Sequence, residues 1–389
     1  MFSFKKKLDY NLRYYLQNNC YSNYRVLIKY RNFEPSICKK ILSYKGKVFN
    51  IIESIKIISA QITARGIEYL LEYPEIEKIF LDDYLFLCGM SVSTANSTHF
   101  SSKNKGLSGC GVGIGLVDSG VYPHHNITTP SNRIEDFTDL VNGLNFPYDD
   151  NGHGTCISGI LCNNSTDIIY KGICPKSKLY CFKAFDKLGK GFASDILFAI
   201  DSLINISHDN NIKILCLPFE SLSNNSLIIS LFHSILHIAT SHGMIPIVAA
   251  GSVKNNNSIL GISTSDNCIS VGGIDYEYSS HGKYKKTIKP DLLAACQNIV
   301  SLNCDCNYIS ERDNLKLYPK KLVVPYKNFS GTSIATAYIC GLCSLVCEKK
   351  NDITFSDIKS LLNISCISNE NDKQNNGKII DSDKLLSFE

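Results

Sequence analysis

The sequence predicts an α/β protein with a doubly wound, mostly parallel sheet, preceded by a small α+β module. From Gly111 onward, apolar strands alternate with helical segments, which is typical of βαβ units. Between Tyr24 and Phe86 the apolar segments instead follow a βαββαβ order. Hydrophobic residues make up 44% of the chain and charged residues 20%, a composition typical of globular proteins.

We expect four parts along the 389 residues. Residues 1–22 are rich in Lys, Tyr and Asn and are interpreted as a leader of unclear structure. Residues 23–86 form the small module. Residues 87–108 are rich in Ser, Thr and Asn and predict an exposed linker with a candidate processing site. Residues 109–389 form the large α/β domain.

Each part has its own predicted elements. In the module we expect strands at 24–30 and 76–81, a strand region at 51–62, and helices at 35–42 and 65–71. In the large domain we expect strands at 112–117, 179–185, 213–219, 245–250 and 269–274, and helices at 194–206, at 227–241 and from 153 and 333 onward. Ser194 is the expected N-cap of its helix.

Charge, cysteine content and the first residues limit the classes of partner. A net charge of +4 is small for this length and predicts no nucleic-acid partner. The first residues contain no long apolar stretch, so we expect neither a secretory signal nor a membrane span. The 17 cysteines have no framework spacing, which favours reduced thiols and a cytoplasmic location, with non-standard export left open.

Three glycine-flanked residues suggest nucleophilic catalysis. Asp118 ends the first strand of the large domain, where open parallel sheets collect functional groups. His153 and Ser333 each stand near the start of a helix. A serine becomes a nucleophile when a histidine takes its proton and a carboxylate orients the histidine. The plain alternative is that all three residues are structural: Asp118 caps backbone groups, His153 packs in the core, and Ser333 is a helix N-cap.

The three segments resemble the signature blocks of the subtilisin family (subtilases) of serine peptidases. They read VDSGV at 117–121, NGHGT at 151–155 and GTSIA at 331–335, in the family's order, and the resemblance covers about residues 105–365. It implies a subtilisin-like fold and a serine endopeptidase with an Asp118/His153/Ser333 triad that cuts a peptide or protein.

The 23–86 module, in turn, resembles the family's inhibitory propeptide. This resemblance implies a ferredoxin-like module and a self-inhibited zymogen, with the chain's own N-terminal part as a partner in the cleft. It also implies autoprocessing in the linker.

One departure from the family concerns the second donor to the oxyanion. The family has Asn at the end of an Ala-Ala-Gly-Asn block, whereas this chain has Ala250, Gly251 and Ser252. A hydroxyl reaches less far than a carboxamide, so we expect a slow enzyme. In this family, removing the donor lowers kcat by about 10²–10³. Asn255 would be the donor instead if the loop shifted its register.

A second departure concerns substrate binding. Pro218, Phe219 and Glu220 replace the family's Ser-Leu-Gly, and this should alter pairing with a substrate backbone. Two interpretations of Glu220 stay open: selection of a basic substrate side chain, or a rim carboxylate in water. Gly189 and Gly191 on the opposite wall keep the glycines that a close peptide strand requires.

No cofactor is required by this chemistry, and calcium is the one candidate metal. Asn164 stands in a segment that resembles a family calcium loop, but Asn126 occupies the position of the usual aspartate. Hard cations prefer carboxylates, so we expect weak or no binding.

The sequence therefore predicts a serine endopeptidase. Because of Ser252 and Glu220, the alternative is a pseudoprotease or regulatory binding module of the same fold, with weak or no turnover. An esterase or acyl-transfer enzyme would use the same triad, but the propeptide-like module favours peptide substrates.

Overall fold

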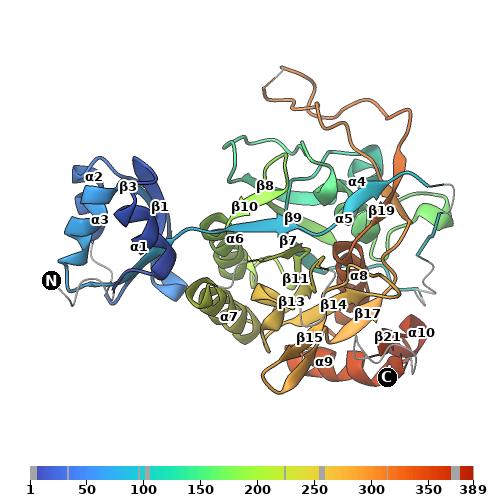
Figure 1. The fold of residues 1–389 in the computed structure, drawn as a ribbon. Helices are drawn as coiled ribbons and strands as arrows, with labels where there is room; N and C mark the ends of the chain where they lie inside the picture. Colours follow the sequence, from blue (N-terminus) through green and yellow to red (C-terminus); the bar gives the residue numbers. More distant parts are fainter. Residues whose placement is uncertain are drawn as a thin grey trace.

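The computed structural model describes residues 7–32, 35–94, 97–100, 106–222, 225–253, 259–312, 314–368 and 377–388. A small N-terminal module lies beside a large α/β domain, and one extended segment runs from the module across the large domain (Figure 1).

The module is a four-stranded antiparallel sheet in the order β2-β3-β1-β4. Its elements are β1 (Asn23–Tyr30), α2 (Pro35–Ser43), β2 (Lys47–Ile52), the turn η2 (Glu53–Ile55), β3 (Ile57–Thr63), α3 (Ala64–Leu71) and β4 (Ile76–Leu81). The strand region predicted at 51–62 is in fact parts of two strands, β2 and β3, joined by η2. The βαββαβ order predicted from the sequence is present.

The two faces of the module's sheet are covered differently. Along β1, Val26 and Ile28 pack in the module's own core, whereas Leu27 belongs to a core shared with the large domain. This follows from the alternation of side chains along a strand. Within the predicted leader, α1 (Tyr10–Gln17) is capped by Asp9 and buries Leu12 in the module's core, so this part is structured.

The large domain contains a nine-stranded sheet in the described part of the chain. In sheet order the strands are β20 (Cys366–Ser368), β21 (Lys378–Ile380), β17 (Leu292–Ala294), β14 (Ile269–Gly273), β13 (Ile245–Ala249), β11 (Ile212–Leu217), β7 (Gly113–Asp118), β9 (Lys178–Lys183) and β8 (Ile134–Asp139). Every neighbouring pair is parallel except β20 with β21. The predicted fold class is confirmed.

Helices cover both faces of this sheet. They are α4 (His125–Thr128), α5 (His153–Cys162), α6 (Ala193–Ile206), α7 (Ser226–Ser241), α8 (Thr332–Lys349), α9 (Phe355–Ile364) and α10 (Ser382–Leu385), with short turns η3 (Ile168–Tyr170) and η4 (Gly261–Thr264) and a hairpin of β15 (Gly282–Tyr284) and β16 (Thr287–Lys289). α5 and α8 share one core, and α6 and α7 share the other. The module packs on the α6 and α7 side (Figure 1).

The start of α6 differs from the prediction. The helix begins at Ala193 with Phe192 at the N-cap position, so Ser194 is not the cap. Instead, Asp82 of the module accepts hydrogen bonds from the backbone N–H and the hydroxyl of Ser194, at 3.0 and 2.7 Å. A carboxylate at a helix N-terminus is favourable. The cap of this helix therefore comes from the module.

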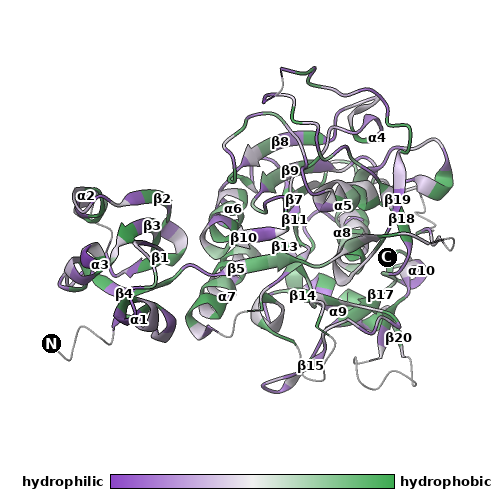
Figure 2. Ribbon diagram, turned by 45° about the horizontal axis from the view of Figure 1, so that its top comes forward, coloured by the Kyte–Doolittle hydropathy of each residue, from purple (hydrophilic) through white to green (hydrophobic). Residues whose placement is uncertain are grey.

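Two small sheets line the path of the segment between the two parts. β5 (Tyr84–Leu87) is the middle strand between β10 (Lys190–Phe192) and β12 (Phe219–Glu220). β6 (Met90–Val92) pairs with β19 (Tyr326–Ser330), which pairs with β18 (Ile299–Leu302). Figure 2 shows β5 as a largely hydrophobic strand. The description of 87–108 as an exposed linker is therefore wrong at its start, since β5 and β6 are paired and Cys88 is buried between them.

All 17 cysteines lie in the described part of the chain, and all are free thiols. Cys340, Cys343 and Cys347 are buried in α8, like every other residue of this helix from Thr332 to Cys347. Of the helices described, none combines the length and apolar character needed to cross a bilayer.

Candidate active site

Asp118, His153 and Ser333 form a hydrogen-bonded chain at the carboxyl edge of the central sheet. The Nδ1 atom of His153 lies 2.8 and 3.0 Å from the two carboxylate oxygens of Asp118. Its Nε2 atom lies 2.9 Å from the hydroxyl oxygen of Ser333. All three side chains are buried. This is the geometry in which a histidine accepts a serine proton while a carboxylate fixes its tautomer.

Asp149 holds the start of α5, and with it His153, in place. It is fully buried, and one carboxylate oxygen accepts hydrogen bonds from the backbone N–H of Gly152 at 2.8 Å and from the hydroxyl of Ser119 at 2.9 Å. The other oxygen accepts the N–H of Thr155 at 2.9 Å. Asp149 thus ties the loop after β7 to the helix of His153. Asp149 did not stand out in the sequence, although an acidic residue just before a glycine-marked helix start is a capping signal.

Ser333 is presented by the first turn of α8. Gly331 has a φ of 151°, and a Cβ at this position would lie 2.5 Å from the backbone oxygen of Cys88. The backbone can therefore approach this closely only at a glycine. Because the first N–H groups of a helix have no partner within it, the N–H of Ser333 is available to another acceptor.

That acceptor belongs to the segment between β5 and β6. The N–H of Ser333 donates to the carbonyl oxygen of Cys88 at 3.2 Å. A Cβ built on Gly89 would lie 2.5 Å from the Ser333 hydroxyl and 3.3 Å from the Nε2 of His153. The peptide bond between Cys88 and Gly89 therefore lies against the nucleophile and its base. Neither residue stood out in the sequence, because only tertiary structure determines which bond reaches the triad.

The predicted second donor is not engaged with this carbonyl. The hydroxyl of Ser252 is buried and forms no hydrogen bond with a described residue, and its backbone N–H donates to Glu220. Asn255, the other candidate donor, lies outside the described residues. With the Cys88–Gly89 peptide bond in the cleft, the carbonyl of Cys88 accepts a hydrogen bond from the N–H of Ser333 and not from the hydroxyl of Ser252.

The two predicted substrate walls both pair with β5. On one side Gly191 lies opposite Leu85, and the carbonyl of Gly189 accepts the N–H of Leu87 at 3.1 Å. On the other side Phe219 lies opposite Leu87. The cleft thus binds an antiparallel strand between two walls, which is the β-augmentation mode of peptide recognition.

The remaining predicted residues support the second wall. Pro218 connects β11 to β12 without an N–H to donate, and Ala250 is buried behind the wall, where its N–H donates to Val271 at 2.9 Å. The carbonyl of Gly251 accepts the hydroxyl of Thr332 at 3.2 Å. This bond joins the wall to the start of α8.

Glu220 does not behave as a rim carboxylate in water. Its side chain is half-buried, and one carboxylate oxygen accepts the backbone N–H of Ser252 at 2.7 Å. Burial raises the pKa of this carboxyl, and the hydrogen bond from Ser252 acts in the opposite direction. The interpretation of Glu220 as a solvated rim charge is therefore wrong.

The candidate calcium loop is closed by amide and hydroxyl groups. The backbone N–H of Asn164 donates to the carbonyl of Asn126 at 2.9 Å, so the two predicted positions are neighbours. The side-chain amide of Asn126 donates to Asn163 at 3.0 Å and to the hydroxyl of Tyr326 at 2.8 Å. The described residues contain no cluster of three or more Asp, Glu, His or Cys side chains suited to a metal ion. This donor set does not fit a resident calcium ion.

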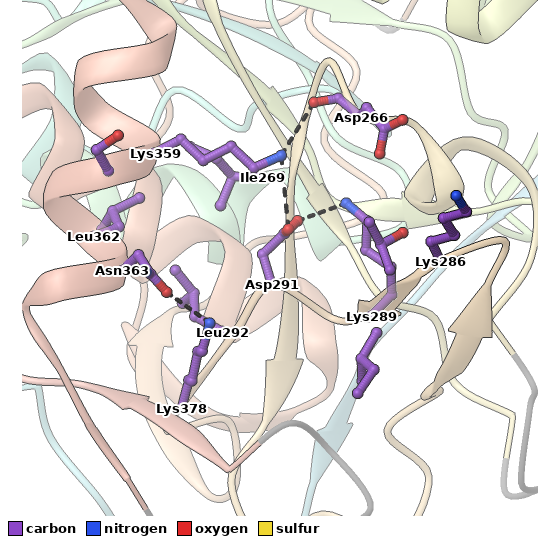
Figure 3. A pocket seen from close by; sticks show the side chains of 13 residues that line it. Asp266, Ile269, Lys286, Lys289, Asp291, Leu292, Lys359, Leu362, Asn363 and Lys378 are labelled. Atoms are coloured by element: carbon purple, nitrogen blue, oxygen red, sulfur yellow. Dashed lines mark hydrogen bonds and ion pairs between the residues drawn. The ribbon is translucent and has the colours of Figure 1, made fainter.

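A cavity of about 520 Å³ lies elsewhere, between β16, β17 and α9 (Figure 3). It is rich in lysines, but three of them are engaged: Lys289 with Asp291 at 2.7 Å, Lys359 with Asp291 at 3.7 Å, and Lys378 with Asn363 at 2.6 Å. It contains no residue of the triad, so its size does not make it the reactive site.

Comparisons with known proteins identify the family of the chain. The profile of the subtilase family matches residues 109–379. The serine protease AprX of Bacillus subtilis is 29% identical over an alignment of 343 residues, which covers 82% of this chain and 76% of that protein.

Two solved structures resemble the fold. Fervidolysin from Fervidobacterium pennivorans, described as a keratinolytic enzyme related to subtilisin, has a TM-score of 0.71 at 17% identity, covering 95% of this chain and 61% of that chain. The epidermin leader peptide processing serine protease of Staphylococcus aureus has a TM-score of 0.69 at 17% identity, covering 95% and 100%.

Proposed function

Because the chain belongs to the subtilase family and is a serine endopeptidase, we propose that Asp118, His153 and Ser333 are its catalytic triad. We also propose that the chain is made as a self-inhibited zymogen that cuts itself between Cys88 and Gly89. The observation that carries the proposal is the hydrogen bond from the N–H of Ser333 to the carbonyl of Cys88. This hydrogen bond reaches the carbonyl oxygen of Cys88, the atom on which the negative charge of the oxyanion would develop during acyl transfer.

The chemistry follows from these contacts. The Ser333 oxygen attacks the carbonyl carbon of Cys88 while the Nε2 of His153 takes its proton, and Asp118 stabilises the resulting imidazolium. His153 then gives that proton to the departing amine of Gly89, and the acyl-enzyme at Cys88 remains. Water, deprotonated by His153, releases the acyl group as a carboxylate and returns Ser333 to its starting state.

In this proposal residues 23–86 act as the propeptide, and β5 occupies the substrate cleft until the module leaves. Support comes from the pairing of β5 with both walls and from the burial of Leu85. After release, the same cleft binds a peptide or protein substrate as an extended strand. The cytoplasmic location stays a prediction.

The proposed enzyme requires no calcium. The loop around Asn126 is closed by its own amide and hydroxyl hydrogen bonds, and carboxylate ligands are what calcium prefers. We expect EDTA to leave the self-cutting rate and the melting temperature unchanged. A fall of several degrees in the melting temperature, restored by added calcium, would contradict this.

The test uses the purified full-length chain. Wild type should yield a fragment whose first residue is Gly89, whereas Ser333→Ala should stay uncut, both followed by mass spectrometry of the intact products. Ser344→Ala is the matched control, because Ser344 lies on the same helix and its hydroxyl forms a hydrogen bond with Ser177 in the core, away from the triad. It should be cut like wild type.

A cut elsewhere in residues 87–108 would refute the assignment of the bond but not the protease. If wild type is not cut and a fluorophosphonate probe fails to label Ser333, the chain would instead be the binding module considered above. The named relatives are proteases, which favours the first outcome.

A further inference from the structure

The side chain of Cys88 is buried near two segments of the cleft: β12, which carries Glu220, and the segment after β13, which carries Ser252. Its exposed fraction is 1%. Burial raises the pKa of its thiol well above the ordinary value, the nearby Glu220 charge adds to the rise, and the hydroxyls of Thr332 and Ser252 act against it. Cys88 therefore enters the cleft as a small, neutral side chain near these three residues.

Glu220 bridges this space from one segment to the other. It belongs to β12, and its carboxylate reaches the backbone N–H of Ser252 at 2.7 Å. A Cβ at Gly251 would lie 2.7 Å from the same carboxylate oxygen, so the side chain lies directly over the backbone of the second segment. The space beside Cys88 is thus crossed by a side chain of five heavy atoms.

We propose that Glu220 shortens the pocket for the residue before the cut and restricts it to small side chains such as Cys, Ala and Ser. The substrate class of the released enzyme is then proteins cut after a small residue within an apolar strand. This inference depends on the proposed function, because it assumes that Cys88 precedes the scissile bond.

Selection of a basic residue, the other interpretation of Glu220, fits these contacts poorly. The carboxylate already accepts a hydrogen bond from Ser252, and it lies beside a side chain with a single heavy atom beyond Cβ. A lysine carries its charge at the end of a four-carbon stem, which would have to pass through the volume that Glu220 fills. Overfilling a packed site is itself destabilising.

The experiment compares four residues at position 88 in the full-length chain. Cys88→Ala and Cys88→Ser should be cut within about threefold of the wild-type rate, whereas Cys88→Tyr and Cys88→Lys should be cut at least about tenfold more slowly. Adding Glu220→Gly to Cys88→Tyr should restore cutting by removing the side chain that fills the pocket.

Glu220→Gln is the matched variant that separates size from charge. Glutamine keeps the length and the acceptor for the Ser252 N–H but removes the charge, so the preference for small residues should remain. If Glu220→Gln instead abolishes the preference for small residues, or if Cys88→Lys is cut fastest, the pocket selects its side chain by charge and the proposal is wrong.

A second measurement avoids misfolded precursors. Self-processed wild-type enzyme, freed of its module, should cleave peptides ending in Leu-Phe-Leu-Ala before the cut at least about tenfold faster than those ending in Leu-Phe-Leu-Tyr or Leu-Phe-Leu-Lys. Equal rates would overturn the inference. Absence of any Ser333-dependent cutting would instead refute the proposed function, so the two failures are distinguishable.

Discussion

The segment that crosses the active site is held very differently on the two sides of the Cys88–Gly89 bond. Before the bond, β5 is paired on both edges, Leu85 is fully buried, and a folded module stands behind it. After the bond, β6 has three residues, pairs with β19 alone among the described strands, and leaves 66% of Met90 exposed. The difference indicates which product of a cut would remain in the cleft.

The segment before the bond belongs to a folded, preorganised module that contributes to its binding in the cleft. The segment directly after the bond is only the short strand β6. Preorganisation reduces the ordering cost of binding. We therefore expect the module to stay bound after the cut, as an inhibitor, while the new end at Gly89 separates from the triad.

The largest effect should come from Arg25, which joins the module to α6. Its guanidinium contacts Asp82 of the module at 2.8 Å and Asp195 of α6 at 2.7 Å. Arg25→Ala leaves both buried carboxylates without this partner, which typically costs about 3–5 kcal/mol. We expect the cut module to dissociate at least about 100-fold more readily, measured by size-exclusion chromatography of the processed enzyme over a dilution series.

The control for this variant is on the same strand. Lys29 pairs with Glu77 at 3.4 Å, but both side chains are about 40% exposed, so Lys29→Ala should cost less than about 1 kcal/mol. Equal effects of the two substitutions would mean that the Arg25 cluster does not hold the module.

A paired truncation tests the two sides directly. Leu85→Ala removes a fully buried side chain and should weaken retention of the module by about 2–4 kcal/mol. Met90→Ala removes a mostly exposed side chain and should change the cutting rate and module retention less than about twofold. The comparison fails if Met90→Ala is as damaging as Leu85→Ala in the same chromatographic assay.

The rate at which the Cys88–Gly89 bond is cut should depend on the donors to its oxyanion. Ser252→Asn introduces a longer donor at a position where the present hydroxyl forms no hydrogen bond with the described part of the chain. We expect the cutting rate to rise by about 10- to 100-fold, less than the roughly 10²–10³ that removal of this donor costs. Single-turnover kinetics of full-length chain would measure it, and an unchanged or lower rate would show that Ser252 does not limit catalysis.

The smallest expected effect is a dependence of module retention on pH. Burial raises the pKa of Asp82 from 3.8 to about 6 and also raises that of Asp195. Separation returns both groups to water, so the docked form holds more protons between about pH 4 and 6. Docking is therefore strongest at low pH and weakens as the pH rises through about 6.

We expect retention of the cut module at pH 5 to exceed that at pH 7.5 by about tenfold, less than the full shift because Arg25 is partly exposed to solvent. Asp82→Asn should reduce this pH dependence. Tighter retention at higher pH would contradict the mechanism.

Local sequence patterns predicted the fold class and, together with the resemblance to the three subtilase signature blocks, the positions of Asp118, His153 and Ser333. Each of these residues is marked by its own neighbours: an apolar strand before Asp118 and glycines around the two helix starts. The βαββαβ module was visible for the same reason. Hydrophobic periodicity and turn residues are short-range signals, and these elements depend on little else.

Tertiary structure decided everything that depends on two distant segments meeting. Asp82 caps α6 in place of Ser194, Glu220 turns toward Ser252 instead of solvent, and Cys88–Gly89 reaches the triad from within a predicted linker. No local pattern encodes such contacts, because each depends on how the module docks on the large domain. The sequence determined the catalytic chemistry of this protein, and the docked structure determined which bond that chemistry faces.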